Sequence, residues 1–262
     1  MSESFSNPKS EPSKYWGLWG TIGFGFITFI VFGILQSVIL IGYAITSGKI
    51  NLEDLSNNES QFKKSIEDLA YNGDLISLAE IPSALVGVGL IMLFIYMKKT
   101  ITLAEYLDLS NPLNPVRTYL KWIGIMLVVF VLMEVVTQLI EHETPEFMTK
   151  VYKSTNNKLM LWIAVAVAAP IFEEFLFRGF LLEGLRRTFL GVTGAILLTS
   201  ASWAIIHMQY GWFEIITIFL IGIIFSVAKL KTESLYVPIA MHVFMNLTAS
   251  IMMEFAPAVE SI

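Results

Sequence analysis

Residues 158–178 read KLMLWIAVAVAAPIFEEFLFR, an apolar run with two adjacent glutamates and an arginine near its end. About 20 mostly apolar residues are enough for a helix to cross the hydrocarbon core of a bilayer. Ionisable side chains inside such a helix are costly and rare, so each is a candidate functional residue. This segment therefore predicts a membrane-spanning helix and a polar site within it.

Similar apolar runs fill most of the chain. Of its 262 residues, 55% are hydrophobic and only 15% are charged, whereas soluble domains have about 25% charged residues. The predicted spans run from about Tyr15 to Thr46, Leu75 to Met97, Tyr119 to Ile140, Lys158 through Glu173, Gly191 to Met208, Trp212 to Ala228 and Leu235 to Met253. We expect an all-α fold, a polytopic transmembrane helix bundle of about seven spans.

The overall charge and the absence of cysteine exclude several classes of function. The chain has no cysteine, which rules out disulfides, cysteine-liganded metal sites and a thiol nucleophile. The net charge is -5 and no basic stripe is visible, so we expect no nucleic-acid partner. Lysine and arginine are more frequent in the loops on the same side of the membrane as the N-terminus. This excess predicts a cytoplasmic N-terminus. The sequence leaves the oligomeric state open.

The chain divides into three regions by composition. Residues 1–14 are rich in Ser, Asn, Pro and Glu, which predicts a disordered tail. Residues 15–158 hold the first three spans and a soluble segment at about 49–74, either an amphipathic helix at the membrane surface or a solvated loop. Residues 159–254 hold most of the polar residues that lie within predicted spans, so we expect the catalytic cavity among these C-terminal helices.

The adjacent glutamates of the fourth span must have different roles. Neighbouring helical residues point about 100° apart, whereas residues four apart share a face. Glu174 and Arg178 have that spacing, and a desolvated carboxylate needs such a partner. We therefore expect Glu174 to be structural. Glu173 lacks a cation one turn away, which makes it the candidate general base.

Two of the three histidines fall inside predicted spans. His207 follows Trp203 by one helical turn, and His242 precedes Asn246 by one turn. Two imidazoles, an amide and an unpartnered carboxylate on three helices suit either a metal site or a water-activating site with an oxyanion hole. His142, by contrast, precedes Glu143 without the second histidine of a zinc-protease motif, and we expect it in a solvated loop.

The order of these motifs is similar to that of a known family. Glu-Glu-x-x-x-Arg, aromatic-x-x-x-His and His-x-x-x-Asn follow one another within about residues 159–250. The chain resembles the CPBP intramembrane proteases, which include type II CAAX prenyl endopeptidases and bacteriocin self-immunity proteins. It departs from the family at Trp203, where phenylalanine is usual; the tryptophan keeps an aromatic wall beside His207.

The resemblance implies a catalytic domain over residues 159–254 that hydrolyses a peptide bond in a membrane-embedded or lipid-anchored protein or peptide. It implies that Glu173 and His207 activate water, and that His242 and Asn246 stabilise the oxyanion. Glu174, Arg178 and Trp203 would support the site. It also implies a multi-pass protein of the bacterial plasma membrane. No cofactor is required in this mechanism, but zinc stays an alternative, with Glu173, His207, His242 and Asn246 as its ligands.

Two other classes of function stay open on the sequence. A protease-like scaffold would bind membrane partners without cleaving them, although every polar residue of the three motifs is present. An ion or proton-coupled transporter would use the buried glutamates and histidines as a path, but the chain lacks the paired interrupted spans of inverted repeats. The sequence does not define the substrate or its cleavage position.

Overall fold

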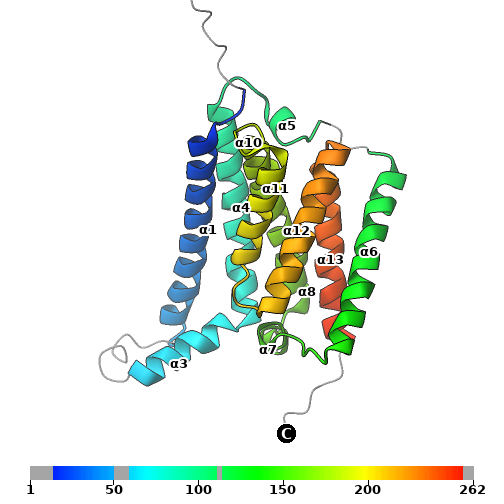
Figure 1. Ribbon diagram of the computed structural model, residues 1–262. Helices are drawn as coiled ribbons and strands as arrows, with labels where there is room; N and C mark the ends of the chain where they lie inside the picture. Colours follow the sequence, from blue (N-terminus) through cyan, green and yellow to red (C-terminus); the bar gives the residue numbers. More distant parts are fainter. Residues whose placement is uncertain (1–13, 50–58, 111–113, 256–262) are drawn as a thin grey trace, which may run out of the picture.

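The computed structural model describes residues 14–49, 59–110 and 114–255, and every regular element within them is a helix. Within these described ranges, six helices are long and apolar enough to cross a membrane, and one further apolar helix is shorter. The long helices run side by side in one bundle (Figure 1). The all-α polytopic fold predicted from hydropathy is confirmed, and the chain is an integral multi-pass membrane protein. Of the predicted disordered tail, all but Lys14 lies outside the described residues.

The bounds of the elements follow the apolar runs closely. The long helices are α1 (Leu18–Thr46), α4 (Gly73–Met97), α6 (Val116–Leu139), the helix Lys158–Leu185, α12 (Trp212–Thr232) and α13 (Tyr236–Phe255). The helix Lys158–Leu185, here called the central helix, comprises α8 (Lys158–Ile163), η1 (Ala164–Ala168), α9 (Ala169–Glu174), η2 (Phe175–Leu181) and α10 (Leu182–Leu185), where η marks π-helical turns. The shorter helices are α3 (Glu59–Ala70), α5 (Leu103–Tyr106), α7 (Glu146–Ser154) and α11 (Gly191–Ile205).

Aromatic stacking and a close glycine contact fix the central helix against α1 and α4. The ring of Phe172 stacks on that of Phe32 in α1, with 4.2 Å between centroids. A Cβ atom on Gly87 of α4 would lie 2.4 Å from a carbon of the Phe172 ring. Any larger residue at position 87 would therefore push α4 away from the helix that carries both glutamates.

The outer faces of the bundle are apolar, as a lipid environment requires. Large hydrophobic side chains such as Phe26, Val38, Val131 and Leu198 are more than 40% exposed. Patches of this extent on a soluble protein would bind another surface or aggregate. In a bilayer they contact lipid tails, while the helices satisfy their own backbone hydrogen bonds.

The fifth predicted span is shorter than expected. Helix α11 has 15 residues and ends at Ile205 rather than at Met208, so it is about 22 Å long at 1.5 Å per residue. The amides of His207 and Met208 bond to the carbonyls of Ala204 and Ile205, three residues back. This tightened turn ends the helix. His207 therefore lies in the turn after α11 and not inside a span, which corrects the sequence-based prediction.

The soluble segment at about 49–74 contains a helix. Within it α3 turns Leu69 toward Ala44 at the end of α1 and Leu75 at the start of α4, and these three residues form a small core. Figure 1 shows α3 and α7 at the end of the bundle opposite α5 and α10. The amphipathic helix, rather than an unstructured loop, is the alternative that the structure supports.

A buried ion network closes the opposite end of the bundle. The predicted sixth span ends at Ala228 and leaves Lys229 in a loop, but Lys229 belongs to α12 and is fully buried. Its ammonium pairs with Asp108 Oδ2 at 2.7 Å and also with Glu183. Glu183 in turn pairs with Arg186 and Arg187. A buried lysine needs such partners, and they join α12 to α10 and to the chain that follows α5.

Candidate active site

A π-helical turn and a proline prepare the central helix for the site. The amide of Ala169 bonds to the carbonyl of Ala164, five residues earlier. The next bond in this register would join residue 170 to the Val165 carbonyl, but Pro170 has no N–H. The amide of Asn246 in α13 donates to the Val165 oxygen instead, at 2.8 Å. The proline thus provides the acceptor that positions Asn246.

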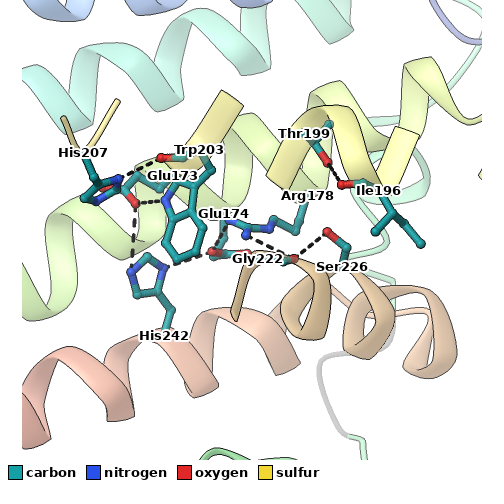
Figure 2. A network of polar contacts seen from close by, with 10 residues as sticks. All are labelled: Glu173, Glu174, Arg178, Ile196, Thr199, Trp203, His207, Gly222, Ser226 and His242. Atoms are coloured by element: carbon teal, nitrogen blue, oxygen red, sulfur yellow. Dashed lines mark hydrogen bonds and ion pairs between the residues drawn. The ribbon is translucent and has the colours of Figure 1, made fainter. Parts of the chain in front are cut away.

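Glu174 and Arg178 form the buried pair that their spacing predicts. Both side chains are fully buried, and Arg178 Nη1 donates to Glu174 Oε1 at 2.9 Å. The guanidinium lies 4.3 Å from the ring centroid of Trp203, and its Nη2 is 3.4 Å from the carbonyl of Gly222. A Cβ on Gly222 would lie 3.1 Å from Nη2. The glycine lets α12 come this close to the arginine, so the charge sits between an aromatic face and a carbonyl (Figure 2).

Glu174 does more than balance Arg178. Its Oε1 also lies 3.0 Å from Nδ1 of His242, a residue 68 positions later in α13. A carboxylate that pairs with arginine can only accept, so Nδ1 carries the proton and Nε2 points to the other side of the ring. The interpretation of Glu174 as a purely structural partner is therefore too narrow. It also fixes the tautomer and the direction of the imidazole.

Glu173 faces the other nitrogen of the same histidine. Its Oε2 is 3.9 Å from His242 Nε2, and its carboxylate accepts a hydrogen bond from the indole Nε1 of Trp203. The Glu173 side chain is 14% exposed, whereas that of Glu174 is 0% exposed. The two glutamates thus have different surroundings, and water can reach only Glu173. The sequence analysis assigned Glu173 no partner and so missed the indole donor.

Trp203 is the centre of the arrangement (Figure 2). Its ring packs edge-on against the His207 ring at 5.5 Å and against the His242 ring at 5.2 Å. It was predicted only as an aromatic wall. A phenylalanine would keep the wall but could not donate to Glu173.

His207 is oriented by the end of α11. Its Nδ1 lies 2.8 Å from the carbonyl of Trp203, which lacks a backbone partner because the His207 amide bonds to Ala204. The side chain caps this orphan carbonyl, as histidines near helix C-termini do. Because a carbonyl accepts, the proton sits on Nδ1 and leaves Nε2 free as a base in the neutral ring.

Asn246 lies at the edge of the site and lines an adjoining cavity. One N–H of its amide donates to the Val165 carbonyl, so the second N–H and the oxygen remain for a ligand.

Tyr210, which the sequence analysis did not single out, stacks on His207 at 6.2 Å and lines the same cavity. Burial raises the pKa of Tyr210 to about 12, so its hydroxyl stays protonated and uncharged at neutral pH. Its position three residues after His207, in the same turn, is the signal that could have found it.

Glu80 was also missed. It lies in α4, is 9% exposed, and its Oε2 is 2.5 Å from Nε2 of Gln36 in α1. It interacts electrostatically with Glu173. An ionisable residue inside the second predicted span was the available signal, by the same rule that selected Glu173.

The donor atoms do not form a metal sphere. Among the residues that the structure describes, no three His, Asp or Glu side chains group as metal ligands would. A catalytic zinc usually takes three protein ligands of the His and carboxylate type. The four candidate ligands therefore do not fit a zinc site as they are placed here.

His142 lies apart from these residues, in the loop after α6, where its side chain is 30% exposed and has an acidic partner. Its Nε2 is 2.5 Å from Glu214 Oε1 in α12, and its ring packs on Phe213 at 4.6 Å. The loop between α6 and α7 returns to α12 and so gives the imidazole a partner that the sequence spacing could not reveal. The third histidine joins this loop to α12 and takes no part in the candidate site.

Comparison with known proteins agrees with the motifs. Residues 155–248 match the family model described as type II CAAX prenyl endopeptidase Rce1-like. A protein of Escherichia coli, described as an uncharacterized 24.3 kDa protein, is 31% identical over 125 residues, which cover 46% of this chain and 57% of the relative. The match thus spans little more than half of the relative's length. No solved structure matches. The family model thus confirms, over residues 155–248, the resemblance drawn from the three motifs.

Proposed function

We propose that the chain is an intramembrane endopeptidase that hydrolyses a peptide bond of a membrane-associated protein or peptide. The observation that carries the proposal is the arrangement around Trp203. Its indole N–H donates to the partly exposed carboxylate of Glu173, and the imidazole rings of His207 and His242 pack edge-on against it. A base, an orienting group and oxyanion donors are the parts that acyl transfer to water requires.

In this mechanism Glu173 and His207 activate the attacking water. Glu173 accepts a proton from the water as its oxygen attacks the peptide carbonyl, and the free Nε2 of His207 accepts a hydrogen bond from the same water. Glu173 then returns the proton to the leaving amine. The indole N–H of Trp203 holds the carboxylate in place throughout.

His242 and the free N–H of Asn246 stabilise the tetrahedral oxyanion. To donate from Nε2, the His242 ring must carry a second proton, because its first proton is directed at Glu174. In other enzymes, removal of one such preorganised donor raises the activation free energy by about 3–4 kcal/mol.

The test is the change Glu173→Gln, which keeps the size of the side chain and removes the proton acceptor. Purified proteins in detergent micelles are incubated with a mixture of apolar peptides, and the products are identified by mass spectrometry. We expect the wild-type protein to cut and Glu173→Gln to be at least 100-fold slower, with an unchanged elution volume and circular dichroism spectrum.

The matched control is Glu134→Gln. Glu134 is also a glutamate of a predicted span, but it lies in α6, and its carboxylate accepts a hydrogen bond from Gln138, one turn away. This variant should cut like the wild-type protein. Cleavage by Glu173→Gln at the wild-type rate would refute the role of the carboxylate, and a folded wild-type protein that cuts nothing would favour the scaffold.

A further inference from the structure

A cavity of about 150 Å³ adjoins the candidate site on the side of α7. Its walls include Val151 of α7, Leu161 and Val165 of the central helix, and Met253 of α13. Most of the lining surface is apolar, and its polar groups belong to Tyr152, Tyr210, Asn246 and Ser250. An engineered cavity of similar volume in another protein holds benzene, so the space is large enough for one aromatic or leucine-sized side chain.

The cavity is continuous with the residues assigned to catalysis. Asn246, the candidate oxyanion donor, lines it, and so does Tyr210, whose ring stacks on that of His207. A group bound in the cavity therefore lies next to the site where the peptide carbonyl would be held. Enzymes select substrates by side-chain pockets in this position relative to the reacting bond.

We propose that this cavity is a substrate subsite that receives one large apolar side chain of the residue adjoining the scissile bond. The inference rests on the proposed endopeptidase function and specifies its substrate class. Burying such a side chain stabilises the bound substrate by removing apolar surface from water. The same burial places the neighbouring carbonyl beside Asn246.

The experiment profiles cleavage sites on a synthetic peptide library in which every amino acid occurs at each position. Peptides are incubated with the purified full-length protein in micelles, and the cut sites are sequenced by mass spectrometry. The wild-type protein should prefer Phe, Leu, Met or Trp on one side of the scissile bond, with at least tenfold higher kcat/KM than for Ala or Gly.

Two cavity variants and one control test where this preference arises. Ala249→Trp fills the space, because Ala249 of α13 lines it, and should reduce kcat/KM for large apolar residues at least tenfold while cutting next to Gly or Ala continues. Met253→Ala enlarges the space and should shift the preference toward Trp; it also serves if Ala249→Trp fails to fold. Leu247→Trp, on the exposed face of the same helix, should leave the profile unchanged.

The outcomes separate the two proposals. If no peptide is cut faster than by Glu173→Gln, the endopeptidase function fails and the subsite fails with it. If cleavage occurs without an apolar preference, or if neither cavity variant changes that preference, only the subsite is refuted. If a lipid tail occupies the cavity instead, cleavage should show no apolar preference, and the amount of lipid that co-purifies should change in Ala249→Trp.

Discussion

Breaking the buried Glu174–Arg178 pair should destabilise the protein before it affects chemistry. In Glu174→Gln the arginine stays fully buried. Its remaining partners are a neutral amide oxygen, the Gly222 carbonyl and the rings of Trp203 and Phe225. Removal of one member of a buried ion pair costs about 3–5 kcal/mol. For a domain of this size, each kcal/mol lowers Tm by about 2–4 °C, so we expect a decrease of roughly 6–20 °C.

The double variant Glu174→Gln with Arg178→Met separates lost charge pairing from lost packing. Removing both charges leaves no unpaired ion, so part of the lost stability should return, about 1 kcal/mol or more relative to Glu174→Gln alone. The glutamine can still accept from His242 Nδ1, so residual activity should follow the folded fraction. Stability is measured by circular dichroism melting in micelles and by titration with a denaturing detergent.

An exposed pair with the same spacing provides the control. Glu146 and Lys150 of α7 are 2.7 Å apart with side chains 74% and 42% exposed, and Glu146→Gln should cost no more than about 0.5 kcal/mol. Our reasoning would be refuted if Glu174→Gln melted within 2 °C of the wild-type protein. It would also be refuted if adding Arg178→Met to Glu174→Gln lowered the stability by as much as Arg178→Met lowers it in the wild-type protein.

Three further predictions concern the site and its orientation. Trp203→Phe removes the donor to Glu173 but keeps the aromatic wall, so kcat should fall about tenfold with little change in KM or Tm; an unchanged kcat would show that the indole N–H does not act on the carboxylate. Activity should survive prolonged dialysis against a metal chelator, since the proposed steps use side chains alone; loss of activity that zinc restores would contradict this. We also propose that the N-terminus is cytoplasmic, in a bacterial plasma membrane. A cysteine at the exposed residue Glu143 should then react with an impermeant maleimide added outside, a cysteine at Lys231 should not, and the opposite pattern would reverse the orientation.

The sequence was sufficient wherever a property depended on one helix alone. Hydropathy located the long spans, because the cost of placing polar side chains in lipid acts on each segment independently. The spacing of Glu174 and Arg178 predicted their pairing, because residues four apart meet on any α-helix. The three motifs also indicated the family, since each lies within a single short segment.

Contacts between segments could not be read from spacing. Whether Glu174 reaches His242, 68 residues later, or Trp203 reaches Glu173, 30 residues earlier, depends on how α11, α13 and the central helix pack. The position of His207 depends on α11 ending at Ile205, and the side chain itself caps that end. The residue types were visible in the sequence, but their partners were not.

The sequence by itself thus determined that this is a helical membrane protein with a polar site of family-typical residues in its C-terminal half. Only the tertiary structure decided that His242 lies between two glutamates, that an indole N–H binds Glu173, and that an apolar cavity adjoins Asn246. The physical reason is that burial in lipid and helical periodicity act along the chain. Hydrogen bonds and cavities between helices depend instead on how the helices pack. Close approaches at glycines such as Gly87 and Gly222 help to determine that packing.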